Sequence, residues 1–401
     1  MIASFVFPGQ ASQYCNMGQA FISEMPDLRE IYESAGEILG RDIYKAIFTE
    51  ENLFLVNKRD IQPAIFITSI VAYSYFNKKF NIQPRFLAGH SLGELTALTV
   101  SGGFSFEDGL RIVDKRSEYM MEAVENTQGV MTSIRNINPQ LVLNYCECEE
   151  NRKVFLSCLN SKQQVVIAGD RLEIEKAERY FLAKGAKINR LNTLGAFHTP
   201  CMKSAAEKLK SFIDSLEVKE LKIPVISNYT GRIYAQKEDV SRLLYLQMMN
   251  SVQWERTVRY LEQSYVDTVI EVGPGTTLKN IISRDSYKIK VFNIENSGDR
   301  EGLLKCKNDS NPYVYRDLIR LCQTVAVNTP VLSKEYKVNE SINHYNQLSN
   351  LSESIKSPFY DRVTINKIFT HLKSILEYKG YNKEQINDLE AKIKNNAGIF
   401  S

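Results

Sequence analysis

The six residues Gly89-His90-Ser91-Leu92-Gly93-Glu94 constrain the fold of this chain more than any other stretch. The apolar residues 86–88 before them predict a short buried strand, and residues 94–98 after them predict a helix. Glycines two residues to either side of Ser91 permit a turn tight enough to join the two elements directly. The stretch is therefore typical of a nucleophile elbow, in which a serine hydroxyl lies at a helix N-terminus that favours negative charge. A plain strand-to-helix turn is the alternative interpretation.

The remaining pattern predicts an α/β protein. Residues 2–7 indicate a first buried strand that ends at a Pro-Gly turn. Between residues 127 and 192 the order becomes strand, helix, strand, strand, helix, strand, which is the ferredoxin-like order inserted into a larger α/β domain. Outside that insert we expect helices at 26–40, 61–79, 106–124, 200–216 and 239–263, and strands at 85–88, 223–227 and 268–272.

After about residue 300 the composition shifts toward Asn, Lys, Ser and Tyr, and helical patterns appear at 312–325, 361–378 and 383–395. The chain is therefore expected to divide into three parts. These are a large domain made of residues 1–126 and 193–298, an inserted subdomain at 127–192, and a mainly helical C-terminal extension at 299–401.

Composition excludes several classes of function. The 50 basic and 47 acidic residues nearly balance, which argues against a nucleic-acid or anionic-membrane partner. Seven scattered cysteines without a C-x-x-C pair suggest free thiols in a reducing cytoplasm. Four histidines without an H-E-x-x-H motif make a metal enzyme unexpected. No apolar run is long enough for a transmembrane helix, and the N-terminus lacks the pattern of a signal peptide.

A serine nucleophile needs a base, and His198 is the favoured candidate. It lies at a predicted strand-to-helix junction between Gly195 and Pro200, whereas His344 and His371 lie in the polar tail. His90 adjoins Ser91, but its side chain should leave the turn in another direction. His198 is therefore expected to deprotonate Ser91 and later to return the proton to the leaving group. A structural loop histidine is the alternative interpretation.

The group that orients His198 is left open by the sequence. Three aspartates lie in the interval between the serine and the histidine, but nothing in the pattern selects one. An amide or a backbone carbonyl would also serve, and Asn160 or the 271–273 turn, with Val272 at its centre, could supply it.

Two further features fit chemistry at Ser91. Backbone amides stabilise the oxyanion of an acyl-transfer intermediate, and the amides of Leu92 and of Gln10, which follows the first strand, are the candidates. Arg116 lies beside the apolar stripe of the predicted helix 106–124 and could clamp a carboxylate with two parallel hydrogen bonds. In a site bordered by Leu92 and Phe197, it would select a dicarboxylic acyl group. An ordinary turn and a solvated helix arginine are the alternatives.

Taken together, five stretches resemble the malonyl-CoA:acyl carrier protein transacylase family of fatty acid and polyketide synthesis. The similarity covers about residues 1–298 and is carried, in order, by Phe7-Pro8-Gly9-Gln10 with Ser12-Gln13, by Gly89–Glu94, by Lys115-Arg116, by Gly195–His198 and by Glu271–Gly275. The resemblance implies an α/β-hydrolase-like domain with a ferredoxin-like insert.

The resemblance also implies a role for each matching residue. Ser91 would be the acylated nucleophile and His198 its base, with histidine in this family typically oriented by a main-chain carbonyl. Gln10 and Leu92 would form the oxyanion hole, and Arg116 would bind the malonyl carboxylate. Leu92 and Phe197 resemble the residues of malonyl-selective members, because a bulky phenylalanine crowds a branching methyl group. The implied substrates are malonyl-CoA and the phosphopantetheine thiol of an acyl carrier protein, with no bound cofactor.

Two departures from the family pattern stand out. Ala11 replaces a glycine that is common in the first motif, which we expect to be a minor change. The tail beyond residue 300 is longer than housekeeping members carry, which resembles a free-standing acyltransferase that serves a polyketide synthase in trans. The tail would either dock such a synthase or cover the core with extra helices. A monomer is expected. The rival function is an acyl hydrolase that clears stalled acyl groups from carrier proteins.

Overall fold

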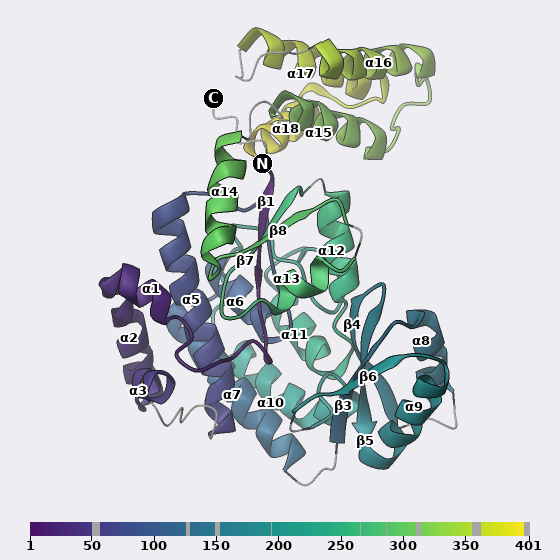
Figure 1. Cartoon of the computed structure of the whole chain (residues 1–401). Coiled ribbons are helices and arrows are strands. Elements are labelled where there is room, and N and C mark those ends of the chain that lie inside the picture. Colours follow the sequence, from purple (N-terminus) through teal and green to yellow (C-terminus); the bar gives the residue numbers. More distant parts are fainter. Residues whose placement is uncertain are drawn as a thin grey trace. The chain divides into compact units, whose positions relative to one another are not determined.

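A computed structural model of the chain describes residues 1–49, 57–125, 129–148, 153–193, 195–264, 266–285, 287–309, 314–354 and 362–396 (Figure 1). Residues 2–303 form one compact unit and residues 304–401 form another. The expected boundary between the large domain and the insert, at residues 126 and 127, lies outside the described residues.

A four-stranded parallel sheet forms the centre of the first unit. Its strands are β1 (Ala3–Phe7), β2 (Phe86–Gly89), β7 (Thr268–Glu271) and β8 (Lys290–Asn293), in the order β2-β1-β7-β8. All residues of β1, β2 and β7 are buried, as expected for a parallel sheet covered on both faces. Phe7 pairs with Gly89 at the carboxyl ends of β1 and β2, so the turns that follow these two strands meet at one edge of the sheet.

Helices surround this sheet. The longest, α5, is apolar on nearly all sides and packs against α6 and α7, which explains why most of its residues are buried. The helices of this unit are α1 (Gln19–Glu24), α2 (Arg29–Leu39), α3 (Ile43–Phe48), α5 (Ile61–Phe80), α6 (Leu92–Val100), α7 (Phe106–Val124), α10 (Lys203–Asp214), α11 (Asp239–Met249), α12 (Trp254–Gln263) and α13 (Thr277–Ile282), with short 3-10 turns at Pro26–Leu28, Lys58–Asp60 and Pro200–Met202. The boundary between the two units falls within α14 (Ser297–Asp309).

A second, antiparallel sheet has the strand order β4-β5-β3-β6. Its elements follow the chain as β3 (Gly129–Arg135), α8 (Pro139–Glu147), β4 (Val154–Ser161), β5 (Gln164–Asp170), α9 (Arg171–Ala183) and β6 (Lys187–Arg190). The Asp170 carboxylate caps α9 by accepting from the amides of Leu172 and Glu173. Both helices pack on the sheet around a core of their own that includes Ile134, Ile167 and Phe181.

The second unit consists of α15 (Val314–Asn328), α16 (Val338–Ser354), α17 (Arg362–Tyr378) and α18 (Lys383–Asn396). These helices pack on one another. They bury a separate apolar core that contains Leu318, Ile319, Cys322, Leu348, Ile368, Phe369, Leu372, Ile375, Leu376, Ile386 and Ile393.

The expected elements differ from the structure in a few places. Residues 223–227 form isolated bridges rather than a strand, because Pro224 has no N–H to give to a ladder. The expected helix 239–263 is interrupted between α11 and α12, where the Val252 backbone bonds to Ser157 and Leu159 of β4. The helices α1, α3, α14 and α16 and the strand β8 were not expected from the sequence.

Candidate active site

Ser91 lies in a strained turn between β2 and α6. Its φ of 54° and ψ of −106° are unusual for a residue with a side chain, and helix α6 begins at the next residue. The flanking glycines are required by close packing. A Cβ on Gly89 would lie 1.9 Å from the carbonyl carbon of Gly93, and a Cβ on Gly93 would lie 2.0 Å from the carbonyl oxygen of Phe7. The strand, turn and helix expected around Ser91 are therefore present.

His198 contacts the serine directly. Its Nε2 lies 2.7 Å from Ser91 Oγ, although the two residues are 107 positions apart in the chain. The imidazole is buried, and burial together with the nearby Arg116 charge lowers the pKa of His198 to about 3. A neutral imidazole at this distance can accept the proton of the serine hydroxyl.

The residue that orients His198 is Gln247. Its backbone carbonyl lies 2.8 Å from His198 Nδ1, and it belongs to the last turn of α11, where carbonyls have no partner within the helix. The expectation that Asn160 or Val272 would orient His198 is wrong. Asn160 Oδ1 instead lies 2.9 Å from Nε2 of His90, and the Val272 amide donates to the carbonyl of Val6 in the adjacent strand.

None of the three aspartates between the serine and the histidine orients His198 either. Asp108 interacts with the Ser105 cap of α7, Asp114 binds Arg41 and Arg59, and Asp170 caps α9. Sequence reasoning missed Gln247 because a backbone carbonyl leaves no signal in the residue type.

Arg116 points from α7 toward the serine. Its Nη2 donates to Ser91 Oγ at 2.9 Å and to Gln247 Oε1 at 3.4 Å, while Nη1 donates to Gln62 Oε1. Arg116 is 1% exposed, and burial lowers the pKa of its guanidinium to about 10, an effect that the Glu94 charge partly opposes. All three acceptors are neutral, and within the described ranges no carboxylate forms an ion pair with this side chain. A buried cation with neutral neighbours beside the serine is suited to bind an anionic group.

The turn that carries Gln10 packs on the elbow. A Cβ on Gly9 would lie 2.4 Å from the carbonyl oxygen of His90 and 3.7 Å from the amide nitrogen of Leu92. The backbone at Gly9-Gln10 therefore approaches the start of α6. Ala11, the departure from the family pattern, has a φ of 77°, a conformation that a glycine adopts without strain.

Phe197, next to the base, is buried. Its carbonyl accepts a 2.9 Å hydrogen bond from Ser157 Oγ of β4, which ties the His198 loop to the second sheet.

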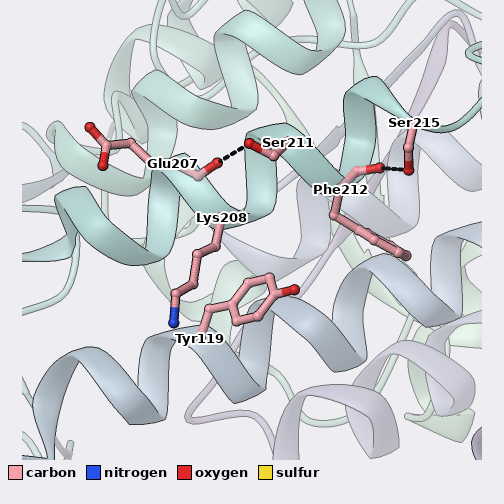
Figure 2. Close-up of a pocket in the computed structure, with 6 residues that line it drawn as sticks. All are labelled: Tyr119, Glu207, Lys208, Ser211, Phe212 and Ser215. Carbon is pink, nitrogen blue, oxygen red and sulfur yellow. Dashed lines mark hydrogen bonds between the residues drawn. The ribbon is translucent and has the colours of Figure 1, made fainter.

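A separate surface pocket of about 550 Å³ lies between α7 and α10 (Figure 2). Its lining residues include Tyr119, Lys208 and Phe212, and none of them belongs to the Ser91 site. The Lys208 ammonium lies 5.6 Å from the centre of the Tyr119 ring and pairs with Glu122. Helix α7 therefore contributes Arg116 to the buried site and Tyr119 to this surface.

In the part of the chain that the structure describes, we find no group of three or more His, Cys, Asp or Glu side chains arranged to hold a metal ion. Over the same residues, no helix is both long and apolar enough to cross a bilayer.

The family model of the acyl transferase domain matches residues 4–297. The chain belongs to this acyl transferase family. The match includes Ser91, His198, Arg116 and both sheets, and it ends just before the C-terminal unit begins.

Named relatives and a solved structure agree with this membership. The malonyl CoA-acyl carrier protein transacylase of Bacillus subtilis (strain 168) is 33% identical over 311 residues, which cover 77% of this chain and 98% of the relative. The polyketide biosynthesis malonyl CoA-acyl carrier protein transacylase BaeC of Bacillus velezensis is 33% identical over 70% of this chain and 96% of its own length. The crystal structure of the malonyl CoA-acyl carrier protein transacylase from Clostridium perfringens has a TM-score of 0.72 at 30% identity and covers 77% of this chain and 98% of that one. The mixed α/β fold with one parallel and one antiparallel sheet is therefore that of these transacylases.

Proposed function

We propose that this chain transfers a malonyl group from malonyl-CoA to the phosphopantetheine thiol of an acyl carrier protein through a Ser91 acyl-enzyme. The observation that supports this proposal best is Arg116. Its buried guanidinium lies 2.9 Å from Ser91 Oγ, and among the residues that the structure describes its hydrogen-bond acceptors are neutral. The free carboxylate of a malonyl group, distal to the thioester, would supply a negative charge for this cation to pair with. The likeness to named malonyl transacylases supports the same substrate.

In the first half of the reaction, His198 Nε2 accepts the proton of Ser91 Oγ as the oxygen attacks the thioester carbonyl of malonyl-CoA. The carbonyl oxygen becomes an oxyanion, which the amides of Gln10 and Leu92 stabilise. The carbon–sulfur bond then breaks, and His198 returns the proton to the coenzyme A thiolate. The Gln247 carbonyl holds the Nδ1–H of His198, so that Nε2 is the nitrogen free to accept a proton.

In the second half, the phosphopantetheine thiol of the carrier protein replaces coenzyme A. His198 takes the thiol proton, and the sulfur attacks the malonyl-serine ester. The ester bond to Ser91 breaks, and the proton returns to Oγ. This is a ping-pong exchange between thioesters, and it uses no bound cofactor.

We assign the selectivity for a dicarboxylic acyl group to Arg116 and the selectivity against a methyl branch to Phe197. Arg116 would pair with the distal carboxylate, while the buried Phe197 beside His198 would crowd a methyl branch. One methyl group is worth only about 1–3 kcal/mol of discrimination, so Phe197 acts as a secondary filter.

The two sheets and the helices also lead us to assign the chain to three parts. We describe the parallel sheet with its elbow as an α/β-hydrolase-like domain of residues 1–126 and 193–298. Residues 127–192, with the chain order of β3 to β6 and the sheet order β4-β5-β3-β6, form the ferredoxin-like subdomain. Residues 299–401 are the helical extension.

We also assign the enzyme to polyketide synthesis in trans, on the likeness to BaeC and on the extension that the family model does not cover. We place the reaction in the cytoplasm. The seven cysteines support this location, since none of them forms a disulfide.

Intact-mass measurement of the protein after incubation with malonyl-CoA tests the proposal. We expect one malonyl adduct that is absent in Ser91→Ala and that moves to holo carrier protein when this is added. Absence of a malonyl adduct, together with loss of acyl groups from preloaded carrier protein, would instead identify the acyl hydrolase.

A further inference from the structure

Glu94 is a buried carboxyl group that the proposed reaction does not use. It lies in the first turn of α6, three residues after Ser91, and its side chain is 0% exposed. Three donors from other elements converge on it. The Tyr234 hydroxyl donates to Oε1, while the Gln247 side-chain amide at 2.8 Å and the Asn228 backbone amide at 3.0 Å donate to Oε2. The carboxyl group is therefore buried with its hydrogen-bonding capacity used, and the residues that donate to it indicate what it does.

The residues that bind Glu94 also hold the backbone of the nucleophile. Asn228 Oδ1 accepts from the amide of Ser91 at 2.6 Å, and Asn228 Nδ2 donates to the carbonyl of Gly89 at the same distance. Gln247 Nε2, which bonds to Glu94, also donates to the carbonyl of Ser91 at 2.9 Å. Both backbone polar groups of Ser91 are thus bonded to residues that the Glu94 carboxyl fixes.

This arrangement explains how the turn keeps its shape. The positive φ of Ser91, combined with a ψ of −106°, is unfavourable on its own and persists only when neighbouring groups hold it. Asn228 and Gln247 come from segments more than 130 positions further along the chain, so they can hold Ser91 only if they are themselves fixed. Glu94 is the common acceptor for both.

We infer that Glu94 is a positioning residue for Ser91, acting through Asn228 and Gln247. Its Oε2 accepts from the side-chain amide of Gln247 and from the backbone amide of Asn228, and the side chains of these two residues hold the backbone of Ser91. The inference rests on Ser91 being the nucleophile of the proposed function, and it does not depend on which acyl group the serine receives.

Burial raises the pKa of Glu94 to about 7, and the hydrogen bonds donated by Tyr234, Gln247 and Asn228 limit this rise because they favour the carboxylate. Arg116 is the nearby cation and also benefits from the negative charge.

The test compares Glu94→Ala with Glu94→Gln in the full-length protein. The amide of Gln can present its oxygen to Gln247 and Asn228 and its NH₂ to the Tyr234 oxygen, so it keeps the connections while removing the charge. Acylation of Ser91 by p-nitrophenyl acetate is followed by rapid quench and intact mass. This neutral ester needs no carboxylate clamp, so the test remains valid even if malonyl-CoA proves not to be the donor.

We expect Glu94→Ala to acylate about 100-fold more slowly than wild type, the effect of displacing a reacting group by about 1 Å. The final amount of acylated chains should be unchanged. Glu94→Gln should remain within about tenfold of wild type, because neutral hydrogen bonds replace charged ones. A merely structural role would instead reduce the fraction of chains that can be acylated and leave the rate of the remainder unchanged.

Two further variants keep the inference testable if Glu94→Ala does not fold. Asn228→Ala removes the bonds to Ser91 and Gly89 and should slow acylation about 100-fold. Tyr234→Phe leaves Oε2 and both its partners in place and should stay within about tenfold. Wild-type rates in Glu94→Ala or Asn228→Ala, or a reduced amplitude at an unchanged rate, would overturn the inference.

Discussion

Arg116 is the side chain whose surroundings most restrict what Ser91 accepts. Its charge lies beside the nucleophile, and its hydrogen-bond partners are amide and hydroxyl oxygens. We predict that Arg116→Ala lowers the rate of malonyl transfer to Ser91 by about 100-fold, the range for losing hydrogen bonds to a charged group. Acylation by acetyl-CoA should persist or increase, because the neutral acetyl group no longer shares the site with a buried cation. Intact mass with each thioester measures both.

The matched control for this prediction is Arg111→Ala on the same helix. Arg111 is exposed and pairs with Glu107 one turn away, so its removal should change neither rate. Equal loss of malonyl and acetyl acylation in Arg116→Ala would contradict the carboxylate clamp and would indicate that Arg116 only positions Ser91.

His198 predicts an unusual pH dependence. Its pKa is lowered to about 3 by burial and by Arg116, so the neutral base persists as the pH falls well below the ordinary histidine value. We expect acylation by p-nitrophenyl acetate to stay nearly constant from about pH 8 to about pH 5, where a histidine with an unperturbed pKa near 6.5 would lose most activity. The Glu94→Gln variant is the right background, since it removes the neighbouring carboxyl whose pKa is raised to about 7.

The sign of the stability effect follows from the same shift. Because the unfolded chain binds a proton on His198 as the pH falls below about 6.5 and the folded chain does not, the free energy of unfolding decreases as the pH falls below that value.

An inflection near pH 6.5 in the acylation rate of Glu94→Gln would contradict the pH prediction, because it would show that His198 titrates normally and that its burial is incomplete.

The sequence predicted which residues meet at the site better than it predicted how they are held. The motifs with Ser91, Arg116 and His198 are separate in the chain, and the structure brings His198 and Arg116 within hydrogen-bond distance of Ser91 Oγ. Residue type alone signals a nucleophile, a base and a cation. Gln247 acts through its backbone carbonyl and Asn228 through its placement beside the elbow, and both depend on tertiary packing that no local pattern encodes.

At the scale of elements, the contact of β1 with α6 depends on Gly93, which has no side chain. A Cβ on Gly93 would lie 2.0 Å from the carbonyl oxygen of Phe7, a backbone atom that cannot rotate away. We therefore predict that Gly93→Ala destabilises the fold by about 3 kcal/mol or more, at the upper end of the overpacking range. Thermal unfolding measures the loss. Gly298→Ala is the control, because the atom nearest to a Cβ on Gly298 would be a side-chain oxygen of Asn296 at 3.3 Å. Similar melting temperatures for wild type and Gly93→Ala would contradict this packing.

Element boundaries were predicted well where local signals are strong. Helix α7 spans Phe106–Val124, as its apolar stripe indicated, and the Ser105 side chain caps it by accepting from the amide of Asp108. The continuous apolar pattern over 239–263 hid the break between α11 and α12, because the break is made by pairing of Val252 with a distant strand. Helix α16 was missed because its sequence is rich in Asn and Ser, which favour turns in isolation; it is helical because it packs on α15 and α17.

At the scale of the whole molecule, the two compact units have separate cores, so damage to one should leave the chemistry of the other intact. Leu372 is 1% exposed in the core of the C-terminal unit, and Leu209 is equally buried in α10 of the first unit. We predict that Leu372→Ala lowers the stability of the C-terminal unit by about 2–5 kcal/mol and leaves the rate of Ser91 acylation unchanged. Leu209→Ala should destabilise the unit that carries Ser91. Calorimetry resolves the two transitions, and the acylation assay reports on the site. A loss of acylation in Leu372→Ala would show that the catalytic unit requires the helical unit, which would favour a core-covering role over a docking role.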